Sequence, residues 1–259
     1  MSDWKPDLYL TFKKERTQPA IDLAVRIDLK DPKRIVDIGC GPGNSTAVLK
    51  NRWPEAEIVG VDNSKAMIEQ AKKSDREIDW VCKDASGDLS ELGKYDIVFS
   101  NAAVQWISDQ RSLLCNLFDI LNSGGILAVQ VPNTKDMPVF IEVQKLVKTP
   151  KWERHFSSMS PIHSVHEASY FYDILCGLTK DIELWVTDYH HVMESHKDIV
   201  KWYSGTGLRP YLDCFTDEDL ENEFLNDFEN AIKDRYPLQK DKRVLFPFTR
   251  IFFIARKTM

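Results

Sequence analysis

The stretch Arg34–Thr46 reads RIVDIGCGPGNST, and it decides the fold because it joins a strand-like segment to a helix-like one. The apolar run Arg34–Ile38 predicts a short buried strand, and Asn44–Arg52 is typical of a helix. Three glycines, Gly39, Gly41 and Gly43, lie between them at alternate positions. Glycine weakens strands and helices alike, so glycines in this place predict a turn whose bare backbone a ligand approaches closely.

Short apolar strands and amphipathic helices continue to alternate as far as Pro132. Further strands are expected at 56–62, 78–84, 95–101 and 125–132, and further helices at 18–27, 64–73 and 109–121. Ser64 is expected to cap a helix, and Pro132 to stop the last of these strands. Alternation of this kind specifies a parallel sheet with helices on both faces. We therefore expect an α/β fold built on a doubly wound, mostly parallel sheet.

The pattern changes after Pro132, although the chain returns to the expected core. A helix is predicted at 169–178, an alternating strand at 182–193 and a closing strand at 243–257. Two segments without alternation, roughly 133–169 and 195–236, are expected to be insertions that build a helical lid. This interpretation makes 1–259 a single domain, with a core of about 15–132, 170–194 and 237–259.

Charge and composition restrict the class of partner. The net charge of −6 argues against nucleic acid, because binding it requires a clustered excess of Lys and Arg. The five cysteines are scattered without a CxxC pair, which is typical of reduced thiols and of neither a disulfide framework nor a zinc site. In the segment HHVMESH, His190–His196, adjacent histidines of a strand point to opposite faces, so we expect no metal.

The N-terminus lacks the pattern of a secretory signal, and no apolar run has membrane-spanning length. We therefore expect a cytoplasmic protein whose partner is a small molecule, with neither nucleic acid nor membrane as a partner. The oligomeric state is left open by the sequence, and a monomer is consistent with it.

The spacing of the glycines separates two classes of ligand. Dinucleotide enzymes use G-x-G-x-x-G to face a pyrophosphate, but here Asn44 takes the third position and the spacing is G-x-G-x-G. This difference disfavours a nicotinamide dehydrogenase. The next strand ends in Asp62, about twenty residues further on, where a carboxylate reaches the hydroxyls of a ribose. The pattern predicts a nucleoside ligand, with or without phosphate.

Four segments, in chain order and each at the end of an expected strand, resemble the class I methyltransferases that use S-adenosyl-L-methionine (SAM). They are VDIGCGPGNST, GVDNS, CKDA at 82–85 and SNAAVQWI at 100–107. The resemblance implies a seven-stranded, Rossmann-like sheet with SAM as methyl donor and S-adenosylhomocysteine (SAH) as product. By the resemblance, the SAM-binding residues are Trp4, Tyr9, Asp37, Gly39, Gly41, Gly43, Asp62, Asn63, Met67, Asp84, Ala85 and Asn101.

Each of these residues has an implied place around SAM. The glycines would lie against its methionine part, and Asp62 would hold the ribose hydroxyls. The adenine would be flanked by Asn63 and Met67, with Asp84 and Ala85 at its edge. The segment 101–105 would form the floor beneath the sulfonium, and Trp4 and Tyr9 would close over the site.

Structural roles remain open for several of the same residues. The glycines would also serve tight packing of helix on sheet, and Asp62 would serve as a turn residue. Asp84 would serve as a helix cap, and Met67 as core filler.

Four segments together resemble the trans-aconitate methyltransferases, and this resemblance covers nearly the whole chain. They are MSDWKPDLYL, AAVQW, HEASYFYDIL and WYSGTGLRPYL. Within them, Trp4–Leu10 and Thr206–Pro210 lie outside the motifs common to all SAM enzymes. The resemblance implies esterification of one carboxylate of trans-aconitate, or of a close polycarboxylate, to a monomethyl ester. The candidate acceptor-binding residues are Arg209, Tyr203, Tyr211, His163, Tyr170, Gln105 and Trp106.

The chemistry is consistent with that acceptor. A carboxylate with a pKa of about 4 is ionised at neutral pH, so in-line transfer requires alignment and exclusion of water but no obligatory general base. Arg209 is the first candidate for a clamp that holds the acceptor's non-reacting carboxylates, because a guanidinium binds a carboxylate in bidentate fashion. The alternative for Arg209 is an ordinary surface arginine.

Two other functions of the protein stay open. One is methylation of a hydroxyl, amine or carbon of another small metabolite, which requires a base near the methyl group; the other is SAM binding without catalysis.

Overall fold

The structure is a computed structural model that describes residues 12–157, 159 and 166–258. It divides into two compact units. The sheet unit contains the described residues up to Pro132, then His166–Thr187 and the described residues from Arg250 onward. The helical unit contains the described residues of 133–165 and all of Asp188–Thr249. The expected insertions fall mostly in the helical unit, and their function as a lid stays a prediction.

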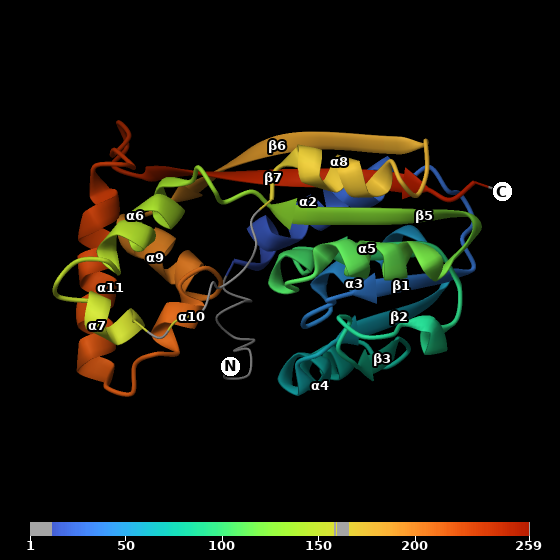
Figure 1. Ribbon diagram of the computed structural model, residues 1–259, viewed down its shortest axis with the longest axis horizontal. Helices are drawn as coiled ribbons and strands as arrows, with labels where there is room; N and C mark the ends of the chain where they lie inside the picture. Colours follow the sequence, from blue (N-terminus) through green and yellow to red (C-terminus); the bar gives the residue numbers. More distant parts are fainter. Residues whose placement is uncertain (1–11, 158, 160–165, 259) are drawn as a thin grey trace. The chain divides into compact units, whose positions relative to one another are not determined.

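Seven strands form one sheet in the order β3-β2-β1-β4-β5-β7-β6. The strands are β1 (Arg34–Ile38), β2 (Glu57–Asp62), β3 (Asp79–Cys82), β4 (Tyr95–Asn101), β5 (Leu121–Pro132), β6 (Ile182–Met193) and β7 (Val244–Arg256). The first five strands pair in parallel, whereas β7 runs antiparallel to β5, and Figure 1 shows β5, β7 and β6 as neighbours. The predicted doubly wound, mostly parallel sheet is confirmed.

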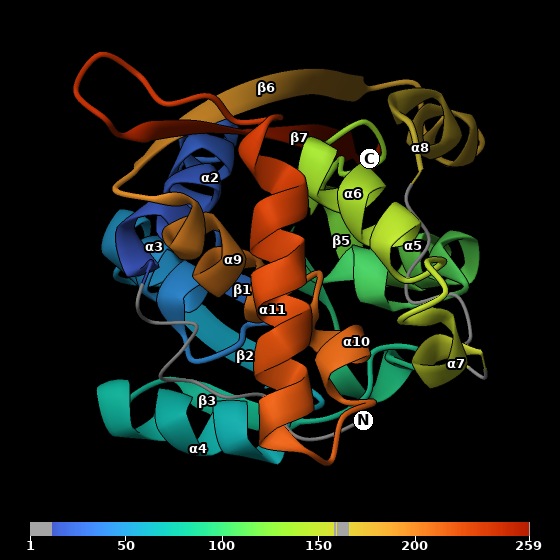
Figure 2. The same ribbon diagram turned by 90° about the vertical axis from the view of Figure 1, so that its left-hand side faces the viewer.

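Helices cover both faces of the sheet within the sheet unit. They are α2 (Lys13–Arg26), α3 (Asn44–Arg52), α4 (Lys65–Ser74), α5 (Gln110–Asp119) and α8 (Ala168–Leu175), with short 3-10 helices η1 (Ser90–Leu92) and η2 (Val104–Trp106). Figure 2 shows α2 and α3 on one side of the strands and α5 and α8 on the other. Leu117 of α5 and Phe171 of α8 belong to the buried cluster that contains Val98 and Val129.

Most helix and strand positions follow the predictions, and the largest difference lies in α2. The sequence predicted this helix from Gln18, but it begins at Lys13 and contains Pro19. Proline removes one helical hydrogen bond, a loss that buried apolar contacts of the same helix offset. Leu23 is completely buried, and Ile27 just after the helix is 1% exposed. The predicted cap is confirmed, because the Ser64 side chain accepts from the backbone N–H of Met67.

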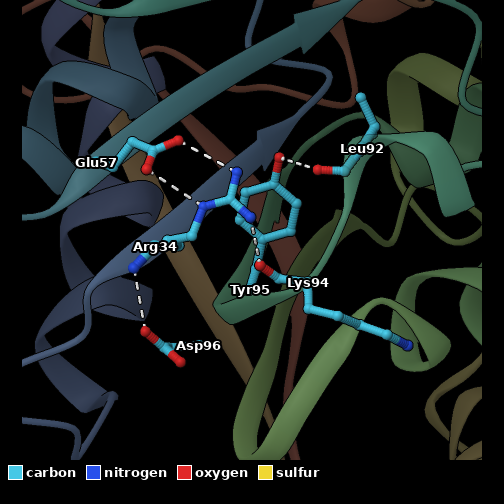
Figure 3. Close-up of polar contacts among 6 residues, drawn as sticks. All are labelled: Arg34, Glu57, Leu92, Lys94, Tyr95 and Asp96. Atoms are coloured by element: carbon cyan, nitrogen blue, oxygen red, sulfur yellow. Dashed lines mark hydrogen bonds and ion pairs between the residues drawn. The ribbon is translucent and has the colours of Figure 1, made fainter.

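The amino-terminal ends of the central strands are joined by Arg34 at the start of β1 (Figure 3). Its guanidinium contacts both carboxylate oxygens of Glu57 on β2, at 3.2 and 3.3 Å, and donates to the Lys94 carbonyl at 2.9 Å. The guanidinium also lies 4.7 Å from the ring centre of Tyr95 on β4. The backbone N–H of Arg34 donates to Asp96. These contacts fix the edge of the sheet opposite to the glycine turn.

The helical unit has its own aromatic core. Its helices are α6 (Pro138–Leu146), α7 (Glu153–Phe156), α9 (His196–Ser204), α10 (Arg209–Leu212) and α11 (Glu218–Lys233). Helix α11 contacts α6 and α9, as Figure 2 shows, and buries Phe224, Phe228 and Ile232. Trp152 is buried against Phe224, with ring centres 5.2 Å apart, and its indole N–H donates to Asp227 at 2.9 Å. The core therefore anchors α7 to α11.

Candidate active site

The glycine turn between β1 and α3 has a backbone that other residues rarely adopt. Gly39, Gly41 and Gly43 have φ angles of +72°, +55° and +92°. The backbone N–H groups of Gly39 and Cys40 both donate to the carbonyl of Val61 on β2, at 2.8 and 3.0 Å. The turn is thus held against the carboxyl end of the neighbouring strand, and its positive φ angles account for the glycines.

The space around the three glycines differs. A Cβ at Gly39 would collide with the Cβ of Ala103, and one at Gly43 would lie 2.9 Å from the Trp80 ring. At Gly41, no described atom lies within 4 Å of the position a Cβ would take. Close packing therefore explains two of the glycines, as the alternative interpretation expected. Gly41 leaves backbone open to a ligand.

Asp62 connects the glycine turn to the end of β2. Its Oδ2 accepts from the backbone N–H of Gly41 at 2.9 Å, and its Oδ1 accepts from that of Ser64 at 2.8 Å. An ionised carboxylate accepts several hydrogen bonds, and the residue is half-buried. The carboxylate is therefore fixed in orientation beside the open backbone, as hydrogen bonding to two vicinal hydroxyls requires.

Asp37 is completely buried in β1 and faces the first turn of α3. Its Oδ2 accepts from the hydroxyls of Ser45 and Thr46, at 2.7 and 2.6 Å. Its Oδ1 is buried and has no hydrogen-bond partner among the described residues. Burial raises the pKa of Asp37 to about 6, although both hydroxyl hydrogen bonds lower it, and the nearby charge of Asp62 raises it further. An ammonium group is the kind of ligand that would satisfy Oδ1 and stabilise the ionised form.

A thiol lies in the same turn but does not compete as a nucleophile. Cys40 is 3% exposed. Burial raises the pKa of its thiol well above the ordinary value, and the charges of Asp37 and Asp62 act in the same direction. The thiol therefore stays protonated at neutral pH, and the thiolate is the reactive form of cysteine.

The residues expected around adenine lie at the ends of β2 and β3. Asn63 is exposed, whereas Met67 in the first turn of α4 is 3% exposed. Asp84 is exposed, and its Oδ1 accepts from the backbone N–H of Ser86 at 2.8 Å, as in a turn. Ala85 is buried and belongs to the apolar cluster on the α5 face. Contact of these residues with adenine stays a prediction.

The expected floor follows β4 and contains buried polar groups. Ala102 has a φ of +56°, which is unusual for a residue with a side chain. Asn101 is 8% exposed and Gln105 is 6% exposed, and their Oδ1 and Oε1 atoms are buried without a partner among the described residues. Gln105 does donate to the Ala102 carbonyl at 2.7 Å, and Trp106 is half-buried at the end of η2. Unsatisfied buried polar atoms are costly in native proteins, so this floor is suited to a polar ligand.

Two polar residues of this edge were missed by the sequence analysis. Gln130 on β5 is completely buried, and Arg250 on β7 is 4% exposed. Arg250 Nη1 donates to Gln130 Oε1 at 3.1 Å. A signal for them exists in the sequence, because each is a polar side chain within a largely apolar strand, ILAVQVP at 126–132 and the run 244–256. Buried polar side chains of this kind require a hydrogen-bond partner.

Three of the candidate acceptor residues lie in the helical unit. Arg209, half-buried, is the first residue of α10. Tyr203 is 2% exposed, its ring fills the space beside Gly207, and burial raises the pKa of its hydroxyl. Burial likewise raises the pKa of Tyr211 to about 12, although the hydrogen bond from Gln144 Nε2, at 2.5 Å, lowers it. Both phenols therefore stay protonated at neutral pH, and acceptor binding by the three residues stays a prediction.

The remaining candidates have separate positions. Tyr170 lies on α8, stacked on His166 with ring centres 3.6 Å apart. His163, Trp4 and Tyr9 lie outside the described residues. The histidines considered for a metal diverge. His190 is exposed, His191 is buried beside Trp202, and His196 hydrogen-bonds to the Tyr236 carbonyl.

Within 12–157, 159 and 166–258, none of the helices combines the length and the apolar character needed to cross a membrane. The same described residues contain no group of three or more His, Cys, Asp or Glu side chains suited to a metal ion.

Known proteins resemble this chain over the candidate site and beyond it. Residues 35–125 match the family described as methyltransferase domain. The trans-aconitate 2-methyltransferase of Escherichia coli strain SE11 is 38% identical over 260 residues, covering 100% of both chains. The structure of the YcgJ protein of Bacillus subtilis has a TM-score of 0.61 at 17% identity, covering 93% of this chain and 99% of that one. Phosphoethanolamine N-methyltransferase 2 of Haemonchus contortus, solved with SAH, has a TM-score of 0.55 at 17% identity, covering 93% of this chain and 53% of that one.

The two kinds of similarity support different statements. The solved structures, at 17% identity, show a shared fold. The similarity to the curated relative extends over both units and is not confined to the domain common to many methyltransferases.

Proposed function

The chain belongs to the family of trans-aconitate 2-methyltransferases, which are SAM-dependent enzymes, and from that membership we propose that it methylates one carboxylate of trans-aconitate or of a close polycarboxylate. The products are a monomethyl ester and SAH. One observation carries the choice of acceptor: the 38% identity spans 100% of both chains, including the helical unit that lies outside residues 35–125.

The geometry of the sheet unit supports SAM as the methyl donor. The open backbone at Gly41 provides room beside a bare main chain, and the oriented carboxylate of Asp62 is suited to ribose hydroxyls. Asp37 Oδ1 would accept from the amino group of the methionine part. These groups fit a nucleoside that carries an amino acid, and no part of the fit requires a phosphate.

SAM supplies an electrophilic methyl group on a positively charged sulfur. The acceptor carboxylate is ionised at neutral pH, so the protein does not need to remove a proton. Its task is to align one carboxylate oxygen with the methyl group, to hold the other carboxylates and to exclude water. The protonated Cys40 and the buried, protonated Tyr203 and Tyr211 do not compete for the methyl group.

Holding the carboxylates that do not react requires cations. Arg209 is assigned this role in the proposal, with the hydroxyls of Tyr203 and Tyr211 and the side chains of Gln105, Trp106, Tyr170 and His163 as further acceptor contacts. A guanidinium provides two parallel donors to one carboxylate, which fixes its orientation as well as its charge. Removal of the Arg209 guanidinium is expected to weaken binding of the acceptor and to leave binding of the methyl donor unchanged.

The test is transfer of labelled methyl from SAM to a panel of carboxylic acids, followed by release of the label in base, as expected for an ester. Transfer to trans-aconitate supports the proposal, and failure to label any tricarboxylate contradicts it. In parallel, Asp62→Ala should weaken SAH binding about tenfold or more in calorimetry, since it removes a charged hydrogen-bond acceptor. Asp79→Ala, an exposed carboxylate on β3, is the matched control and should bind SAH like the wild type.

The same assay decides between the acceptor classes. Label in an ether, amine or carbon product would establish another small-metabolite methyltransferase. SAH binding without transfer to any acceptor would establish a SAM-binding protein without catalysis.

A further inference from the structure

Arg250 and Gln130 form a buried, positively charged pair that the proposed mechanism leaves without a role. Arg250 is 4% exposed and Gln130 is completely buried, and Arg250 Nη1 donates to Gln130 Oε1 at 3.1 Å. Because the amide is neutral, the pair as a whole carries one positive charge.

The register places this pair on the same face of the sheet as Asp37 and Asn101. In β5, Gln130 pairs with Asn101 of β4 on one side and with Phe252 of β7 on the other. Directly paired residues share a face, as do residues two apart along a strand, so Gln130, Asn101, Phe252 and Arg250 share one. Asp37 joins them because it pairs with Phe99, two residues before Asn101.

The pair also lies at the carboxyl edge of the sheet, where the glycine turn is. Arg250 pairs with Pro132, the last residue of β5, and Gln130 lies two residues before it. The backbone carbonyl of Gln130 accepts from the N–H of Ala102, the second residue of the floor segment 101–105. In open parallel sheets, ligands bind at this edge.

The hydrogen bonding of Gln130 indicates a ligand with acceptor atoms. Its Oε1 accepts from Arg250, so its Nε2 is the donor, and this buried Nε2 has no hydrogen-bond partner among the described residues. Donors from Gln130 and Arg250 side by side match the two oxygens of a carboxylate.

Two molecules bring carboxylates into the proposed reaction, SAM and the acceptor, and the sheet order distinguishes their sites. The methionine carboxylate belongs to SAM, which the proposed function assigns to the glycine turn and Asp62, at the ends of β1 and β2. Arg250 on β7 is three strand spacings from β1, a distance of about 14 Å across the sheet. Arg250 therefore lies beyond β4, which the floor follows, and away from β1 and β2.

We propose that Arg250 and Gln130 bind a carboxylate of the acceptor that is not methylated, and that they thereby select polycarboxylates over monocarboxylates. This inference rests on the proposed function, because it assigns the acceptor a cationic contact within the sheet unit.

The test compares Arg250→Gln with Arg256→Gln on the same strand. Arg256 pairs with Ile126 near the opposite edge of the sheet, and its guanidinium is 3.8 Å from Asp181, so it is a matched control. Arg250→Gln should raise the KM for trans-aconitate by about 10- to 100-fold, because it removes a charged hydrogen bond, and should leave the Kd for SAH within about threefold. Arg256→Gln should change neither constant by more than about twofold.

Gln130→Leu gives a second reading if Arg250→Gln does not fold, and intact SAH binding shows that a variant is folded. It should raise the same KM by several-fold and reduce the preference for tricarboxylates over monocarboxylates. An unchanged KM in folded Arg250→Gln, or in Gln130→Leu where Arg250→Gln does not fold, overturns the inference. Equal losses of affinity for SAH and for the acceptor overturn the inference too, because the pair would then bind the methionine carboxylate.

A binding measurement separates this inference from the proposed function. Calorimetry of trans-aconitate in the presence of SAH reports acceptor binding without transfer. If the wild-type protein transfers no methyl group but binds the acid, and Arg250→Gln abolishes that binding, the pair is a carboxylate site although the proposed function fails. If the wild-type protein binds none of the acids, the inference fails as well.

Discussion

Replacing Asp37 by asparagine should change how the stability of the ligand-free protein depends on pH. Burial raises the pKa of this carboxyl from 3.8 to about 6 in the folded protein. The folded state therefore holds a proton that the unfolded state has lost between these two values, and folding stability falls as pH rises through this window. The asparagine cannot ionise, so this group causes no fall in the stability of the variant as pH rises.

The magnitude follows from the size of the shift. A change of about two pKa units corresponds to about 3 kcal/mol over the full window, of which about 2 kcal/mol falls between pH 4 and pH 7.5. The free energy of unfolding of Asp37→Asn, minus that of the wild type, should increase by about 2 kcal/mol over this range. Constant costs of the substitution, such as a buried amide N–H without a partner, cancel in this comparison.

The assay is urea denaturation of both proteins without SAM or SAH at several pH values, followed by far-ultraviolet circular dichroism. The control is Asp79→Asn, which replaces an exposed carboxylate on β3. The difference between its free energy of unfolding and that of the wild type should stay nearly constant with pH. If the difference for Asp37→Asn also stays constant within about 0.5 kcal/mol, the carboxyl is not shifted as described, and the reasoning from its burial is refuted.

Four further substitutions test other parts of the structure. Gly39→Ala should impair folding, because its Cβ would collide with Ala103. Gly41→Ala should fold, with about 1–2 kcal/mol of backbone strain, and should bind SAH more weakly. Thermal melts measure the stability of both variants and calorimetry measures SAH binding; two equally stable variants would contradict the difference in packing. For Asp96, burial alone would raise the pKa, but hydrogen bonds from Asn122 and two backbone N–H groups hold it below the ordinary value. Asp96→Asn should therefore destabilise the protein near pH 7 by about 1–3 kcal/mol, and this loss of stability should shrink as pH falls through the folded-state pKa. Denaturation at pH 7 and pH 3.5 tests the prediction, and a loss of stability that grows on acidification would contradict it. Arg209→Ala should raise the KM for trans-aconitate about tenfold or more and leave SAH binding unchanged, and equal effects on both would remove Arg209 from the clamp.

The sequence determined the elements that depend on local patterns. The strand at Arg34–Ile38, the helix at Asn44–Arg52 and the strand at Ile182–Met193 have the predicted bounds, because apolar periodicity and turn residues act over a few positions. The carboxylate of Asp62 was found for the same reason, since it ends a recognisable strand. The order of the motifs along the chain was sufficient for the family.

Only the tertiary structure decided which residues meet across the sheet. The pair Gln130–Arg250 joins residues 120 positions apart, and nothing in their local patterns shows that antiparallel pairing of β5 with β7 brings them together. In the same way, the three glycines of the turn differ in their surroundings, which distant segments determine. The Trp80 ring of β3 faces Gly43, whereas no described atom lies close to the position of a Cβ at Gly41. Side-chain periodicity tells which face a residue takes, whereas the neighbour on that face depends on strand order, which short-range patterns do not encode.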